Sequence, residues 1–314
     1  MKKAILIPII IGSSLLVVGG TLFGLSIYFS TKDNKTITNT YELEDFNNLD
    51  ITLSTADLKF VPTTDGTRKV ECVEKEKQYH EVTVSEDTLT IKLVDSRKWY
   101  EHAFNFDFSR KSVTVYLPEK EYGNLKIVSS TSYIDIPKDL TFAELSSKVS
   151  TGNVTMNATI KGATAIETST GNVSIETNTD KLTVVTSTGS VKLNNVTVTS
   201  GLGVKVSTGD LNFTNVKAQS ADLVTSTGDV KLTDIVINNQ LKIKTSTGSV
   251  KLIDSDAETI NIETSTGNVN ATLLTSKIFD VRTNTGKVNY PTSTSGGLCQ
   301  IKTSTGNVKI EIKE

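Results

Sequence analysis

The stretch that decides the fold is Thr186-Ser187-Thr188-Gly189-Ser190-Val191, because close copies of it recur through the C-terminal half of the chain. Its Ser-Thr-Gly core, or a near copy, occurs nine times, and successive glycines are 18 to 20 positions apart. A fixed period of this length is typical of a repeat architecture. The nine glycines are Gly152, Gly171, Gly189, Gly209, Gly228, Gly248, Gly267, Gly286 and Gly306.

Apolar and polar residues alternate on both sides of each glycine, which is the period of two of half-buried strands. Around Gly189 the apolar positions are Leu182, Val184, Val191 and Leu193. The intervening positions carry charged or hydroxyl side chains, as expected of a solvated face. Each repeat is therefore expected to consist of a strand, a glycine turn, a second strand and a variable return loop.

Nineteen residues are too few for a strand with a crossover helix, but they suffice for one coil of a solenoid. We therefore expect an all-β, parallel β-solenoid of about 19-residue coils, with glycine at corners of positive φ. Right-handed coiling, as in a right-handed β-helix, is preferred because parallel crossovers take that hand. Residues 131–314 are the regular repeats, and residues 38–130 keep the alternation without the repeat. The latter are expected to form an N-terminal β cap and the first irregular coils.

The N-terminus predicts a membrane anchor. After residues 1–3, a cytoplasmic stub with two lysines, residues 4–30 contain no charged side chain. This length exceeds the roughly 20 residues that span a bilayer. We expect an uncleaved signal-anchor helix at residues 4–30, a linker at residues 31–37, and the solenoid on the outer side of the cell membrane.

The chain resembles a bacterial "putative adhesin" family of unknown function that is built of β-strand repeats. The resemblance depends on Phe46-Asn47-Asn48-Leu49-Asp50-Ile51, on Val113-Thr114-Val115-Tyr116-Leu117-Pro118, and on the later Ser-Thr-Gly-Asn-Val phrases. It implies an anchored β-solenoid of the bacterial envelope, in some cases associated with envelope stress. It supplies no catalytic residues.

Composition excludes several functions. The net charge of −2 argues against a nucleic-acid partner, which normally requires a basic excess. Two cysteines and two histidines leave little material for a zinc site, and no cofactor or metal is expected. The three acids Asp254, Asp256 and Glu258 lack the glycine of a calcium loop. A disulfide between Cys72 and Cys299 remains open.

No catalytic set is evident, because the chain has no Gly-x-Ser-x-Gly phrase and no motif that ties a histidine to a nucleophile. We therefore expect a non-enzymatic scaffold that contacts envelope proteins or cell-surface glycans. The alternative is a parallel β-helix polysaccharide hydrolase or lyase that uses Asp210 and Asp229, which share one turn position in successive coils.

Aromatic residues are concentrated in one short segment of the expected cap. The simplest interpretation is that they pack over the open end of the solenoid. A contact surface for sugars or proteins is the second interpretation, because exposed aromatics and arginines are common contact anchors. Its candidate residues are Trp99, Tyr100 and Arg110.

Overall fold

The computed structural model describes residue 21, residues 36–98 and residues 109–313. From Ile37 onward, the regular elements of the described residues are all β-strands. No helix within the described residues is long and apolar enough to cross a membrane. The predicted transmembrane segment, residues 4–30, lies outside the described residues except for Thr21, and so do Trp99 and Tyr100.

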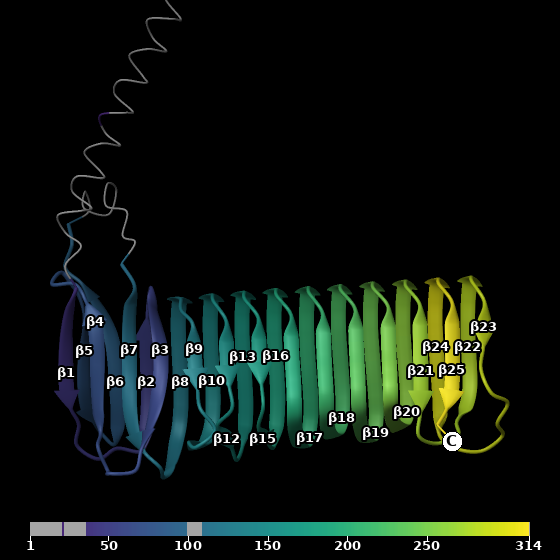
Figure 1. Ribbon diagram of the computed structural model, residues 1–314, viewed down its shortest axis with the longest axis horizontal. Coiled ribbons are helices and arrows are strands. Elements are labelled where there is room, and N and C mark those ends of the chain that lie inside the picture. The colour runs from purple at the N-terminus through teal and green to yellow at the C-terminus, as the bar shows by residue number, and fades with distance from the viewer. Residues whose placement is uncertain (1–20, 22–35, 99–108, 314) are drawn as a thin grey trace, which may run out of the picture.

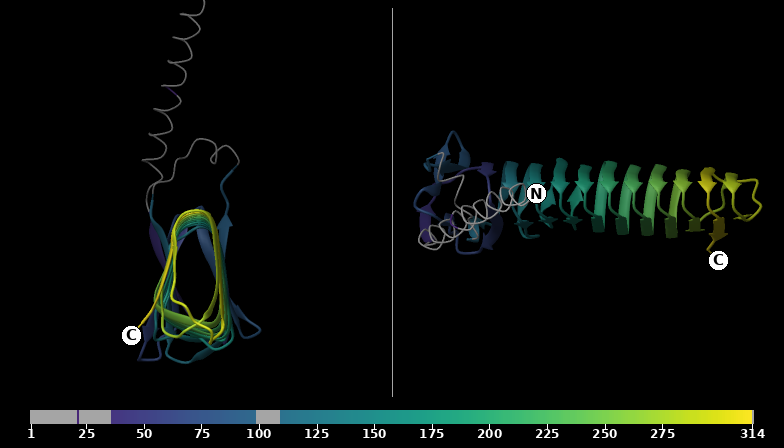
Figure 2. Two further views of the ribbon diagram at one scale, coloured as in Figure 1. Left: turned by 90° about the vertical axis from the view of Figure 1, so that its right-hand side faces the viewer. Right: turned by 90° about the horizontal axis from the view of Figure 1, so that it is seen from above.

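The strands stack into a rod whose cross-section is a narrow closed loop (Figures 1 and 2). One long side of the loop is a ladder of parallel strands that precede the glycine corners. In spatial order these are β2 (Asn48–Leu53), β8 (Glu121–Thr131), β10 (Thr141–Thr151), β13 (Ala163–Thr170), β16 (Lys181–Thr188), the C-terminal parts of β17 (Val191–Thr208), β18 (Leu211–Thr227), β19 (Val230–Thr247) and β20 (Val250–Thr266), then β24 (Leu298–Thr305) and β22 (Ile278–Thr285).

The opposite side is a ladder of the parallel strands that follow the corners. It comprises β3 (Ala56–Thr63), β9 (Ile134–Ile136), β11 (Val154–Met156), β14 (Val173–Ile175), the N-terminal parts of β17 to β20, then β21 (Val269–Leu273), β25 (Val308–Ile312) and β23 (Val288–Asn289). The short strands β12 (Thr159–Ile160) and β15 (Asn178–Thr179) lie between the two sides.

Equivalent positions of neighbouring coils pair with each other, so each inward column becomes a continuous apolar stack. Leu193 pairs with Phe213, Phe213 with Leu232, and Leu232 with Leu252. All four side chains are buried. The all-β parallel solenoid predicted from the alternation is confirmed.

Residues of positive φ form two of the corners of each central coil. At the first, glycine has positive φ, for example 149° at Gly228, and a Cβ there would overlap the carbonyl oxygen of Gly209 in the preceding coil. The second corner is a left-handed Asn or Asp six residues later, at Asn195, Asn215, Asp234 and Asp254 (φ 48° to 55°). Short polar side chains tolerate this conformation better than others do.

The sequence predicts a return loop beyond the second corner, but the structure has no loop there in the central coils. The residues continue as strand, and Val196 and Val198 pair with Val216 and Ala218 of the next coil. These four side chains are buried. The third wall forms because the Asn corner turns the chain without interrupting its pairing with the neighbouring coils.

At the N-terminal end, the solenoid is elaborated by strands that run antiparallel as well as parallel. The strands are β1 (Ile37–Glu42), β4 (Lys69–Glu74), β5 (Gln78–Ser85), β6 (Thr88–Asp95) and β7 (Lys111–Pro118). β6 continues the β2 side and β7 continues the β3 side. β5 then pairs antiparallel with β6, while β4 and β1 extend the β7 side antiparallel. We call these five strands the cap.

At the C-terminal end, the order of the coils departs from the order of the chain. β24 lies between β20 and β22, and β25 lies between β21 and β23 (Figure 1). The last coil in sequence is thus inserted beneath the last coil in space. Because β22 and β23 have no further coil above them within the described residues, Val288 and Tyr290 are exposed.

Candidate functional site

The corner column that follows each glycine contains the two acids considered for catalysis. In this column, the backbone N–H of one coil donates a hydrogen bond to a side-chain oxygen of the coil below. Asp229 N–H donates to Asp210 Oδ1 at 2.8 Å, and Ser249 N–H donates to Asp229 Oδ1 at 2.7 Å. The Asn172 N–H likewise donates to Asn153 Oδ1 at 2.8 Å. Each exposed carboxylate therefore acts as one rung of a ladder that joins coils.

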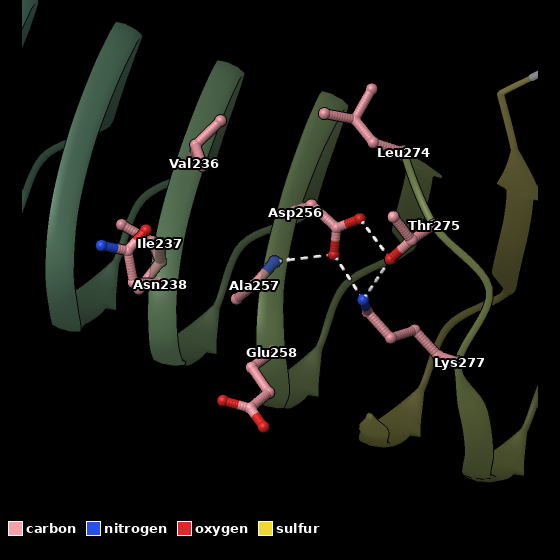
Figure 3. A pocket seen from close by; sticks show the side chains of 9 residues that line it. All are labelled: Val236, Ile237, Asn238, Asp256, Ala257, Glu258, Leu274, Thr275 and Lys277. Atoms are coloured by element: carbon pink, nitrogen blue, oxygen red, sulfur yellow. Dashed lines mark hydrogen bonds and ion pairs between the residues drawn. The ribbon is translucent and has the colours of Figure 1, made fainter. Parts of the chain in front are cut away.

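The three acids Asp254, Asp256 and Glu258 do not converge on a common point. Asp254 pairs with Lys313 at 2.7 Å, and Asp256 pairs with Lys277 at 2.7 Å. Glu258 is exposed and points away from Asp256 (Figure 3). Their carboxylates therefore do not form a shared calcium cage.

An open groove of about 450 Å³ lies above Asp256 (Figure 3). Three of its polar side chains, Asp256, Thr275 and Lys277, are already paired with one another. Thr275 Oγ1 donates to Asp256 Oδ2 at 2.7 Å, and the Ala257 N–H donates to Asp256 Oδ1 at 2.7 Å. The buried Lys277 also pairs with Asp256, so this network holds the segment that leads into β22 in place.

The cap brings together the one group of potential metal ligands found among the described residues: Cys72, Glu74 and His80. Alternation along β4 turns Cys72 and Glu74 inward, and alternation along β5 turns His80 inward. A tight turn, in which Lys75 and Gln78 exchange backbone hydrogen bonds, carries the chain from β4 to β5. The donor atoms of the three side chains lie within 4.8 Å of one another, and all three residues are buried.

Glu74 is the centre of this cluster. One carboxylate oxygen accepts hydrogen bonds from the backbone N–H of His80 at 2.6 Å and pairs with His80 Nδ1 at 2.8 Å. The other accepts a hydrogen bond from Asn39 Nδ2 at 2.6 Å. The second ring nitrogen, His80 Nε2, is buried and has no hydrogen-bond partner within the described structure.

Burial dominates the electrostatics of the cluster. It lowers the pKa of His80 in spite of the opposing effect of Glu74, so the neutral imidazole is favoured near neutral pH. It raises the pKa of the Cys72 thiol to about 12, with Glu74 acting in the same direction. Neutral imidazole is the form that binds metals, whereas a thiol at Cys72 must lose its proton to do so.

A polar groove of about 390 Å³ lies at the side of the cap, where the chain leaves β6 and returns to β7. Asp95 and Arg97 form a close ion pair at its wall, with 2.6 Å between Arg97 Nη2 and Asp95 Oδ2. The hydrogen bonds from Arg97 hold the pKa of the Asp95 carboxyl well below its usual range. Lys111 and Gln78 line the floor, joined at 2.6 Å. Arg110, the described member of the predicted contact surface, is exposed next to this groove.

The remaining cysteine is far from the cluster. Cys299 lies in β24 near the C-terminal end of the rod, whereas Cys72 lies in the cap (Figure 1). Both are buried free thiols, so the disulfide left open above is absent from the structure. Burial raises the pKa of Cys299 to about 12.

Sequence reasoning missed the Cys72, Glu74 and His80 cluster because the cap has no repeat to align. The available signal was the Cys-x-Glu alternation of β4, followed six residues after the Glu by a His of inward parity in β5. Without the turn at residues 75–78, nothing in the sequence places the two strands face to face.

These features make the protein a parallel β-solenoid with an elaborated N-terminal cap. The chain belongs to the Toastrack DUF4097 family, whose model matches residues 46–202 and 200–314. The resemblance drawn from the Ser-Thr-Gly-Asn-Val phrases is thereby confirmed. No curated protein matches the chain.

The chain is similar to solved structures at low sequence identity. A "putative adhesin" from Parabacteroides distasonis is 16% identical, with a TM-score of 0.52, over 88% of this chain and 98% of that one. A "putative adhesin" from Parabacteroides merdae is 14% identical, with a TM-score of 0.49, over 90% of this chain and 98% of that one. At 16% identity, the similarity to the Parabacteroides distasonis structure shows a shared fold and nothing about function.

Proposed function

We propose that this protein is a non-enzymatic, membrane-anchored scaffold of the bacterial cell envelope that contacts proteins or glycans. The observation that carries the proposal is the uninterrupted stack of coils from β2 to β22. Backbone pairing and the corner ladder join every coil to the next, which makes the molecule a stiff spacer. The acids and amides of the corner column serve that ladder, as Asp210 and Asp229 illustrate.

The anchor and the contact surface fit one end of this spacer. β1 begins at Ile37, directly after the predicted linker, so the predicted helix would hold the rod by its cap. The polar groove beside Arg110 lies on that same cap, and its lining includes Arg97 and Ser109, which precede and follow the sequence segment that contains Trp99 and Tyr100. The charged and amide side chains around this open groove could form hydrogen bonds with a peptide backbone or with the hydroxyl groups of a sugar.

The test is crosslinking in living cells with a photo-reactive residue at Arg110, and at Lys244 on the exposed side of the rod as a comparison. Capture of membrane or wall-synthesis proteins, or of wall glycan, from Arg110 supports the envelope scaffold. Capture only of added host glycan would instead identify an adhesin. Polysaccharide cleavage by the purified protein that is lost in Asp210→Asn would favour the hydrolase or lyase alternative.

A further inference from the structure

We propose that Cys72, Glu74 and His80 form a binding site for a divalent cation of the zinc class inside the cap. The sulfur, oxygen and nitrogen donors lie within 4.8 Å of one another, on two strands that the turn at residues 75–78 brings face to face. Mixed thiolate, imidazole and carboxylate ligands are those that zinc takes in proteins. This inference is independent of the scaffold function proposed above.

The donor atoms are spaced close to the distances of a zinc site. Zinc binds sulfur at about 2.3 Å and nitrogen or oxygen at about 2.0 to 2.2 Å, so its ligand atoms lie roughly 3.3 to 3.7 Å apart in a tetrahedron. Separations of up to 4.8 Å would have to shorten, and the 2.8 Å between His80 Nδ1 and Glu74 Oε2 would have to lengthen if both atoms bind the cation. Asn39, which donates to Glu74 Oε1 at 2.6 Å, already orients the carboxylate, as outer-shell partners of metal ligands do.

The orphan nitrogen of His80 is a second and independent indication. Its Nε2 is buried and has no hydrogen-bond partner in the described part of the chain, although buried polar atoms are nearly always paired. Glu74 occupies Nδ1 and leaves a lone pair for Nε2. A cation bound at Nε2 would leave Glu74 on Nδ1 as the orienting partner of the imidazole, as in carboxylate–histidine–zinc groups, whereas a cation bound at Nδ1 would replace that hydrogen bond.

The charge balance also favours a cation. When the metal binds, the Cys72 thiol transfers its proton to solvent and its sulfur forms the metal bond. The thiolate and the Glu74 carboxylate then carry two negative charges, which a divalent cation neutralises. Without a cation, the buried carboxylate lies beside a thiol, and its hydrogen-bond partners are the Asn39 amide, the His80 backbone N–H and the His80 ring.

The site would join the two sides of the rod. β4 belongs to the β3 and β7 side and β5 to the β2 and β6 side, and each strand pairs only within its own side. A cation held by Cys72, Glu74 and His80 would cross-link these sides at the end of the solenoid. The ends of repeat proteins need caps, and this cation would stabilise one of them.

The test uses the full chain, purified in detergent, stripped with a chelator and titrated with Zn²⁺ against a competing chromophoric chelator. We expect one equivalent to bind and the thermal unfolding midpoint to rise. Cys72→Ser and His80→Gln should each weaken binding by at least the roughly 10- to 100-fold that loss of an outer-shell partner costs. Cys299→Ser is the matched control, since Cys299 is equally buried and its pKa is equally raised.

A second readout does not require the ligand variants to fold. Co²⁺ added to the Cys299→Ser protein should give the near-ultraviolet thiolate-to-cobalt charge-transfer band, which can then come only from Cys72. No band and no stoichiometric Zn²⁺ uptake in this protein would overturn the proposal. Unchanged affinity in folded Cys72→Ser would overturn it as well.

Discussion

At the scale of single residues, the solenoid depends on glycines, which have no side chain, as much as on its buried apolar side chains. Nine glycines line one corner of the rod, and a Cβ on any of them would overlap the carbonyl of a neighbouring coil. Another residue would therefore fit this corner poorly, because the backbone there has a positive φ and because a Cβ has no room. Each glycine fixes both the direction of its own chain and the distance to the coil beside it.

Gly228→Ala is expected to destabilise the protein by at least about 1 to 3 kcal/mol, the cost of holding a side chain in such a backbone region. Overlap with the Gly209 carbonyl should add to that cost. The measurement is the urea midpoint of the purified chain. Gly203→Ala is the control, because a Cβ at Gly203 would meet only the Leu182 carbonyl oxygen, at an ordinary 4.0 Å. Equal midpoints for the two variants would contradict the corner geometry.

The Cys299 thiol should be unreactive in the folded protein. Its pKa is raised from 9.0 to about 12, so the protonated thiol is favoured up to that pH and the thiolate fraction at pH 8 falls by about 1,000-fold. The stabilising effect of keeping it protonated is complete below pH 9 and is lost as the pH rises toward 12. Iodoacetamide at pH 8, followed by peptide mass mapping, should label Cys299 only after unfolding. Rapid labelling of the native protein would refute the assigned burial.

At the scale of elements, the C-terminal insertion explains an irregularity of the corner column. Asn307 receives the Lys287 N–H at 2.8 Å and donates its own N–H to Asn268 Oδ1 at 2.8 Å. Lys287 has no coil above it in the described structure, so its side chain need not accept a hydrogen bond. A lysine in a column of Asn, Asp and Ser thus marks the outermost rung, and its charge discourages pairing at the open edge.

This order of coils makes a directional prediction. Asn307→Ala should cost about 1 kcal/mol, because the Lys287 N–H loses its acceptor inside the stack. Lys287→Ala should change the unfolding free energy by less than about 0.5 kcal/mol, as is usual for an exposed surface position. Chemical denaturation of both variants measures the difference. If the coils followed chain order, Asn307 would be outermost, its side chain would accept no such hydrogen bond, and Asn307→Ala would be nearly as mild as Lys287→Ala.

The parts of the fold that could be predicted are those with a local signal. Alternation of two residues fixes which side chains face inward, so columns such as Leu182 and Val184 follow from the sequence alone. The second corner also left a periodic trace, in Asn195, Asn215 and Asp234, but the residues beyond it vary too much to indicate a strand. The insertion of β24 and the meeting of β4 with β5 depend on contacts between distant segments, which no local pattern records.

At the scale of the whole molecule, the rod is a stack in which each coil contacts only its neighbours. In such an arrangement, stability depends on how many neighbours a coil has. The central strands β18 and β19 are covered on both sides, whereas β22 and β23 form the last layer of the described structure. Phe279 and Val281, which occupy inward columns of β22, are only partly buried for this reason.

Amide hydrogen exchange should therefore vary along the rod, since local opening is easiest where the fewest contacts are lost. We expect β22 and β23 to exchange first and β18 and β19 last, and mass spectrometry of peptic peptides resolves these segments. Phe279→Ala should speed exchange in β22 without affecting β18, because the two strands share no contact. The equivalent change Phe213→Ala, in a fully buried central coil, should speed exchange in β17, β18 and β19 together. Uniform exchange along the rod, or equal spread from both variants, would show that the molecule opens as one cooperative unit instead.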